Sequence, residues 1–175
     1  LDELNIKTTW FTVGKVFEKY PLAIQKIQHS CHEIGSHTYG HISPFSSRFK
    51  ALEQDFSLLS KLRSEETPLH GFHSPKGEWS HKLFPFMKAF RYDVIGNKRK
   101  RNMEVYRVKK GKLDLLRLQT LGDDWPLFNK SVSENESYNY FDSLLQKLKN
   151  GQLAGIGFHP WILFSNPFIW KDFKT

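Results

Sequence analysis

The sequence has 175 residues and a net charge of +8, with 39% hydrophobic, 15% aromatic and 25% charged residues. This composition excludes disordered, collagenous and coiled-coil chains and predicts one globular domain over residues 1–175. The single cysteine, Cys31, excludes an intrachain disulfide and a zinc site built from several thiolates, so a metal site needs histidine and carboxylate ligands.

Apolar runs alternate with amphipathic stretches along the chain. In chain order we expect a strand at 8–13, a helix at 16–29, strand 33–36, helix 48–64, strand 69–72, helix 79–90, strands 92–95, 104–108 and 112–118, helix 133–150 and strand 153–158. A Ser133/Glu136 capping box begins the last helix and Gly151 ends it. This alternation predicts parallel pairing in an α/β fold, either an open doubly wound sheet or a barrel.

No apolar run approaches the roughly 18 residues of a membrane-spanning helix, so no membrane span is expected. No secretory pattern of basic, apolar and small residues stands at the start of the sequence. The expected location is therefore cytoplasmic, with other locations left open.

Functional residues of such folds lie at the carboxyl ends of the strands. His37 and His41 follow the strand at 33–36, and two histidines four residues apart can reach one metal ion from a tight loop. The pair alone is weak support for a metal site, because the chain holds eight histidines and such a spacing also arises by chance.

Three further polar segments follow predicted strands. HGFHSPKG (70–77) contains a turn fixed by proline and glycine, whose backbone amides can face a ligand. GDDW (122–125) pairs two carboxylates with an indole, and HPW (159–161) ends the last strand. Taken alone, 70–77 is equally explained as an ordinary turn and 122–125 as an exposed turn with a packed Trp, and for His159 the favoured interpretation is a histidine that satisfies a backbone carbonyl. Their convergence on one rim, however, predicts the active site of an α/β barrel.

TTWFTVGKVFEKYP (8–21), followed by HEIGSHTYGH (32–41), resembles the NodB-type polysaccharide deacetylases of carbohydrate esterase family 4. The turn, the carboxylate–Trp pair and the late strand ending in histidine follow in the family's order. The resemblance implies a distorted, incomplete (β/α) barrel. It also implies hydrolysis of an N-acyl amide, usually N-acetyl on a glucosamine unit, with a divalent metal, most often Zn²⁺, bound by one Asp and two His.

The resemblance assigns roles to residues of this chain. His37 and His41 become the metal ligands, His159 protonates the leaving amine, and Asp124 orients and charges its neighbours. The backbone amide of Lys76 is the oxyanion donor by position. The substrate pocket comprises His73, Pro75, Trp125 and Trp161.

The chain departs from the family pattern in three places. The opening strand, with the base and the Asp ligand, is expected upstream of residue 1, so we expect the first strand to be missing and this chain alone to hydrolyse little. His73 stands where the family has Arg. Pro160 follows His159, as in branches that act on small cyclic amides or peptidoglycan-like substrates. The substrate is therefore an N-acetylated carbohydrate or a small amide, and the oligomeric state is left open.

A second hypothesis starts from residues 97–117, which contain nine basic residues and two acidic ones. A degenerate deacetylase fold with this segment could bind an anionic polymer or a nucleic acid. The simpler interpretation is a solvated hairpin without a partner, so nucleic acid is not the expected partner.

Overall fold

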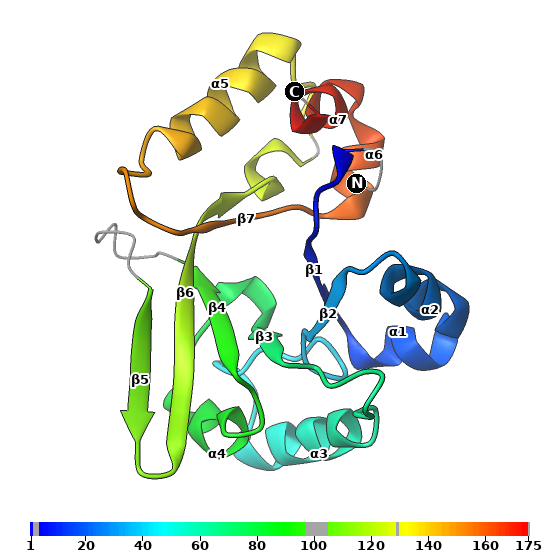
Figure 1. The fold of residues 1–175 in the computed structure, drawn as a ribbon, viewed down its shortest axis with the longest axis vertical. Helices are drawn as coiled ribbons and strands as arrows, with labels where there is room; N and C mark the ends of the chain where they lie inside the picture. Colours follow the sequence, from blue (N-terminus) through cyan, green and yellow to red (C-terminus); the bar gives the residue numbers. More distant parts are fainter. Residues whose placement is uncertain (2–3, 97–104, 129, 175) are drawn as a thin grey trace. The chain divides into compact units, whose positions relative to one another are not determined.

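A computed structural model describes residues 1, 4–96, 105–128 and 130–174 (Figure 1). The chain divides into two compact units. The first comprises Leu1–Ile95 and Tyr106–Arg117, and the second comprises Gly96–Val105 and Leu118–Thr175.

The first unit is built on strands in the order β1-β2-β3-β4-β6-β5. Strands β1 (Thr9–Thr12), β2 (Glu33–Ser36), β3 (Gly71–His73) and β4 (Tyr92–Gly96) pair in parallel. Strand β5 (Tyr106–Lys110) and the first part of β6 (Leu113–Asp123) form an antiparallel hairpin. Parallel neighbours need crossovers, which the helices between the strands supply. The predicted mixed α/β architecture is confirmed.

The helices of this unit are α1 (Gly14–Lys19), α2 (Pro21–His29), α3 (Phe49–Ser60) and α4 (Phe84–Met87), with 3₁₀ turns η2 (Pro75–Gly77) and η3 (His81–Leu83). The helix expected over 16–29 is thus two helices. Proline lacks an N–H and disfavours helical geometry in the residue before it, and Tyr20 accordingly leaves the helical region with φ −136° and ψ 57°. Pro21 then begins α2 at a position where proline is well tolerated.

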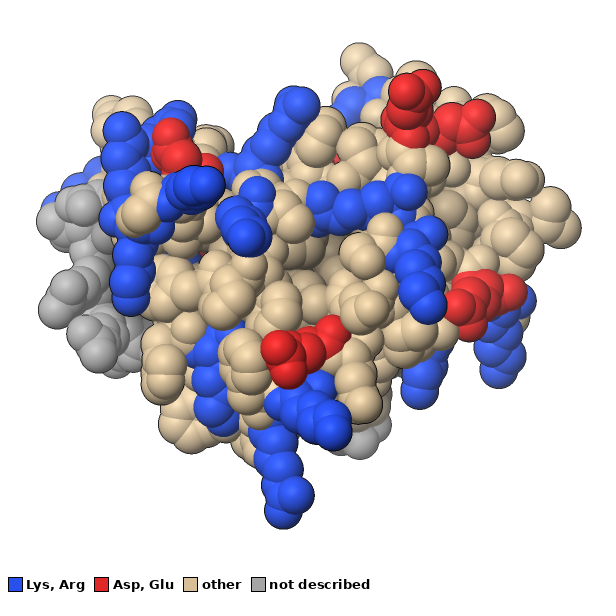
Figure 2. All heavy atoms as spheres, turned by 90° about the horizontal axis from the view of Figure 1, so that it is seen from below, with Lys and Arg blue, Asp and Glu red and all other residues tan. Residues whose placement is uncertain are grey.

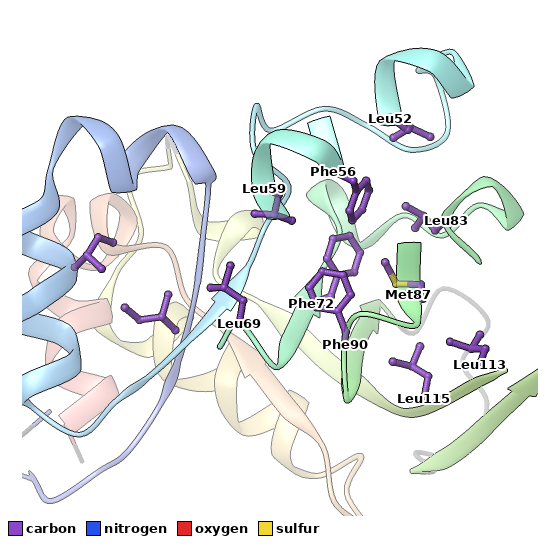
Figure 3. Packing of buried hydrophobic residues seen from close by; sticks show 12 residues of the cluster. Leu52, Phe56, Leu59, Leu69, Phe72, Leu83, Met87, Phe90, Leu113 and Leu115 are labelled. Carbon is purple, nitrogen blue, oxygen red and sulfur yellow. The ribbon is translucent and has the colours of Figure 1, made fainter. Parts of the chain in front are cut away.

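The core of the first unit lies between α3 and the sheet. Leu52, Phe56 and Leu59 are buried along one face of α3. Figure 3 shows Phe56, Phe72 and Phe90 turned toward one another, with ring centroids 5.1 to 6.3 Å apart. Each fully buried side chain of this size contributes roughly 1.5–3 kcal/mol, so this cluster holds α3 on the strands that carry the candidate site.

An ion pair is buried beside this core. The Arg117 guanidinium donates Nε–H to both oxygens of Asp93 at 2.9 and 3.1 Å, and its Nη2 to Oδ2 at 2.6 Å. The guanidinium lies 3.8 Å from the ring centre of Trp79. Asp93 lies in β4 and Arg117 in β6, so the pair links the two strands. Removing one partner would leave an uncompensated buried charge.

The second unit contains the later part of β6, which pairs in parallel with β7 (Gly155–Gly157). Its helices are α5 (Glu134–Leu145), α6 (Pro160–Ser165) and α7 (Pro167–Lys174), with the 3₁₀ turn η4 (Trp125–Leu127). The predicted capping box at Ser133 and Glu136 is confirmed. An apolar cluster of Leu127, Val132, Ile162, Leu163 and Ile169 forms the core of this unit. In the described part of the chain, no helix is long and apolar enough to cross a membrane.

Candidate functional site

The two predicted metal ligands lie in a loop at the carboxyl end of β2. His37 donates Nδ1–H to the backbone oxygen of His73 at 2.7 Å, because a carbonyl can only accept. In the neutral ring the lone pair then lies on Nε2. The rings of His37 and His41 have centroids 5.0 Å apart and planes inclined by 51°.

These two imidazoles fit a divalent metal. A ring whose nitrogen lies about 2.0–2.1 Å from zinc has its centre roughly 3.2 Å from the ion, so two rings on one tetrahedral ion lie about 5 Å apart. The observed centroid separation of 5.0 Å agrees with that value. Within the described ranges, no group of three or more His, Cys, Asp or Glu side chains is placed to hold a metal.

Asp55, which sequence reasoning missed, holds the loop between the two histidines. This α3 residue is 6% exposed, and its carboxylate accepts the backbone N–H of Tyr39 and of Gly40, each at 2.7 Å. From α1, Gly14 donates its N–H to the oxygen of Thr38 at 2.9 Å. Thr38 is buried and has a φ of 63°, a conformation that a β-branched residue rarely adopts. The contacts from two helices therefore keep the loop in a strained shape.

His73 lies next to His37 at the end of β3. Their rings are parallel within 5°, with centroids 5.4 Å apart. The turn that follows His73 is the short η2 helix, begun by buried Pro75. Lys76 has a φ of 60° there and an exposed side chain. The turn geometry is that expected from the sequence, and the oxyanion role of the Lys76 amide stays a prediction.

The second unit brings together the acid predicted at His159 and its partner. Asp124 is 0% exposed, and its Oδ2 accepts the backbone N–H of His159 at 2.8 Å. Its Oδ1 accepts the His159 Nδ1–H at 2.5 Å. This hydrogen bond raises the pKa of His159, against the opposing effect of partial burial. A buried carboxylate on Nδ1 directs the other nitrogen, Nε2, outward.

Two tryptophans flank the His159 ring. Trp125 lies edge-on with its ring centroid 5.6 Å away, and Trp161 lies 4.9 Å away. They are 55% and 57% exposed. Tyr140 donates its hydroxyl to the backbone oxygen of Asp123 at 2.7 Å, and burial raises the pKa of that tyrosine to about 12. The hydroxyl therefore remains protonated and holds α5 on the segment that carries Asp124.

The predicted site residues thus form two clusters. The first unit groups His37, His41 and His73 near the η2 turn with Pro75 and Lys76. The second unit groups Asp124, Trp125, His159 and Trp161. The convergence of both clusters on one rim stays a prediction.

Asp55 was detectable only as a carboxylate among apolar residues of an amphipathic helix, which is an unusual position for an unpaired acid.

Each cluster follows the carboxyl end of a strand, which is where active sites lie in (β/α) barrel enzymes. The sequence profile of the polysaccharide deacetylase family matches residues 1–95, more than half of the 175 residues. The chain belongs to this family, as the motifs at 8–21 and 32–41 predicted. No curated protein sequence matches the chain.

Solved structures share the fold. A Mycobacterium smegmatis protein assigned as a polysaccharide deacetylase aligns over 99% of this chain and 65% of its own, at 20% identity and a TM-score of 0.73. PuuE allantoinase aligns over 98% of this chain and 60% of its own, at 16% identity and a TM-score of 0.65. A family 4 carbohydrate esterase from Streptomyces lividans, solved with acetate, aligns over 98% of this chain and 76% of its own, at 17% identity and a TM-score of 0.59.

These structures confirm the predicted deacetylase-type α/β fold. The chain spans less than two thirds of the M. smegmatis protein and of PuuE allantoinase.

The basic segment of the second hypothesis is only partly described. Lys98, Arg99, Lys100 and Arg101 lie outside the described residues. Of the remainder, Arg107 pairs with Asp114 at 2.9 Å, and Arg117 is buried. On the face seen in Figure 2, basic side chains are interspersed with acidic ones. Arg107 and Arg117 therefore already pair with carboxylates of this protein, which makes them less available to an anionic partner.

Proposed function

We propose that this protein is a metal-dependent hydrolase that removes an N-acyl group, such as acetyl, from an amino sugar. The observation that carries the proposal is the His37–His41 pair. Its ring separation of 5.0 Å suits two ligands of one ion, and the His37 tautomer is fixed with the lone pair on Nε2.

In this proposal His37 and His41 would hold the metal through Nε2 of His37 and one ring nitrogen of His41. Zn²⁺ held there would supply Lewis-acid chemistry, which would polarise the acyl oxygen and lower the pKa of water at the site. The backbone amide of Lys76 faces the oxyanion that develops on the acyl group.

His159 supplies the proton for the leaving amine. Its Nδ1–H is committed to Asp124, so the proton that moves is the one on Nε2. The carboxylate stabilises the imidazolium form, which raises the pKa of His159 and keeps a larger fraction protonated at neutral pH. Trp125 and Trp161 present exposed ring faces beside that proton donor and limit the access of water to it.

A small cyclic amide is the second candidate substrate. The observation that favours it is Pro160 directly after His159, where α6 begins. Similarity to PuuE allantoinase supports the shared fold alone, at 16% identity.

Zinc content and hydrolysis test the proposal together. We expect the protein to bind about one zinc ion, and His37→Ala to abolish most of this binding, while His81→Ala on the exposed η3 turn leaves it unchanged. Release of acetate from N-acetylglucosamine oligomers, compared with ring opening of a cyclic ureide, separates the two substrate classes, and a chelator should stop either reaction. Zinc binding that survives His37→Ala would contradict the proposal.

A further inference from the structure

His73 contacts the predicted ligand His37 in two ways. Its backbone oxygen accepts the His37 Nδ1–H at 2.7 Å. Its imidazole lies parallel to the His37 ring, with planes inclined by 5° and centroids 5.4 Å apart. The first contact selects the tautomer of His37, and the second limits rotation of its ring.

The His73 ring is itself fixed by two neighbouring strands. Its Nδ1–H donates to the backbone oxygen of Val94 in β4 at 2.9 Å, and Val94 is also its partner in the β3–β4 register. Phe11 of β1 lies against the same ring, with centroids 5.4 Å apart. The plane of the His73 ring is therefore set by the sheet and not by the loop that carries His37.

We propose that His73 is a positioning residue that transmits the orientation of the sheet to His37. By stacking on His37, it sets the direction in which the Nε2 lone pair meets a divalent metal. This inference rests on the proposed metal-dependent function and extends it to the residue that stands where the family has Arg.

The stacked arrangement has a physical reason. The loop with His37 and His41 contains two residues of positive φ, Thr38 and His41, at 63° and 58°. Such a loop does not by itself fix the side-chain torsions of its histidines. A rigid planar neighbour removes rotational freedom from His37 before the metal arrives, so less is lost on binding. Loss of that pre-ordering of one side chain corresponds to about a 2- to 10-fold decrease in metal affinity.

Two substitutions separate the ring from its hydrogen bond. His73→Phe keeps a planar ring against His37 and removes the donor to Val94. His73→Asn keeps an N–H donor near the position of Nδ1 and removes the ring. His81→Asn, in the exposed η3 turn, is the matched control for loss of an imidazole elsewhere.

The Zn²⁺ affinity of the protein is measured by competition with a chromogenic chelator. We expect His73→Asn to bind Zn²⁺ about 2- to 10-fold more weakly than wild type, and His73→Phe to stay within about 1.5-fold of it. With Co²⁺ as probe, the ligand-field absorption of His73→Asn should shift, while that of His73→Phe should resemble wild type. The backbone oxygen of residue 73 that accepts the His37 Nδ1–H is kept in both variants, so long-range ¹H–¹⁵N spectra of the metal-free proteins should show the same His37 tautomer in wild type, His73→Asn and His73→Phe.

Equal Zn²⁺ affinity in wild type and both His73 variants would overturn the inference, as would a loss in His73→Phe as large as that in His73→Asn. Thermal unfolding separates a merely structural role: lower stability with an unchanged Co²⁺ spectrum also overturns the inference. If wild type binds no Zn²⁺, the proposed function fails as well, whereas normal wild-type binding with unaffected variants overturns this inference alone.

Discussion

Replacement of Asp55 by Asn tests whether the carboxylate clamp holds the histidine loop in place. The side chain is 6% exposed and accepts N–H groups from Tyr39 and Gly40 at 2.7 Å each. Asparagine has one acceptor oxygen and an NH₂ group, so one backbone donor would face another donor. A hydrogen bond to a charged group contributes about 1.5–3 kcal/mol, and Asp55→Asn should therefore destabilise the protein by about 2–3 kcal/mol.

Urea unfolding measures this change in the free energy of unfolding directly. In thermal unfolding of a chain of this size, the same change of about 2–3 kcal/mol corresponds to a decrease in Tm of roughly 4–12 °C. Glu53→Gln makes the same acid-to-amide change at an exposed position of α3 and should stay within about 0.5 kcal/mol of wild type. If Asp55→Asn and Glu53→Gln unfold at the same urea concentration, the carboxylate does not hold the loop and the reasoning is refuted.

Three further changes test separate contacts. Asp124→Asn should lower the pKa of His159, followed by NMR titration. It should also remove stabilisation that wild type has in full below about pH 6.5 and loses as the pH rises through the raised pKa of His159. Arg117→Met leaves Asp93 buried without its partner and should cost about 3–5 kcal/mol in urea unfolding; a cost below 1 kcal/mol would contradict a buried pair. Gly71→Ala places a methyl group 2.4 Å from the tyrosine ring that faces it in β4, and should cost about 1–3 kcal/mol in the same assay.

Local patterns predicted the strands near the candidate site and its histidine pair. The β-branched and aromatic run at 8–13 contains β1, and the expected strand 33–36 coincides with β2. The pattern is clear at β1, because Thr, Trp and Phe favour an extended backbone. It is weaker at β2, because Glu33 and Gly35 belong to residue types that are depleted in strands. The break at Pro21 was also present in the sequence as a helix-disfavouring residue, but the apolar spacing across it concealed the boundary.

Other features depended on contacts between distant residues. Helices α6 and α7 were not expected, because they are only six and eight residues long and each begins at a proline, a residue that also marks turns. Asp55 lies 15 and 16 residues from the amides that it accepts. No local pattern encodes that pairing, because the partners meet only after α3 packs on the sheet.

The histidines of the two clusters share one arrangement and differ in the charge of one partner. His37, His73 and His159 each donate Nδ1–H to an oxygen, which places their remaining chemistry on Nε2. For His37 and His73 that oxygen belongs to a neutral backbone carbonyl. For His159 it belongs to buried Asp124, which favours the imidazolium and raises the pKa of the ring. In the proposed mechanism this charged partner suits His159 to donate a proton, and Asp124→Asn should lower the pKa of His159 toward the ordinary value of a histidine.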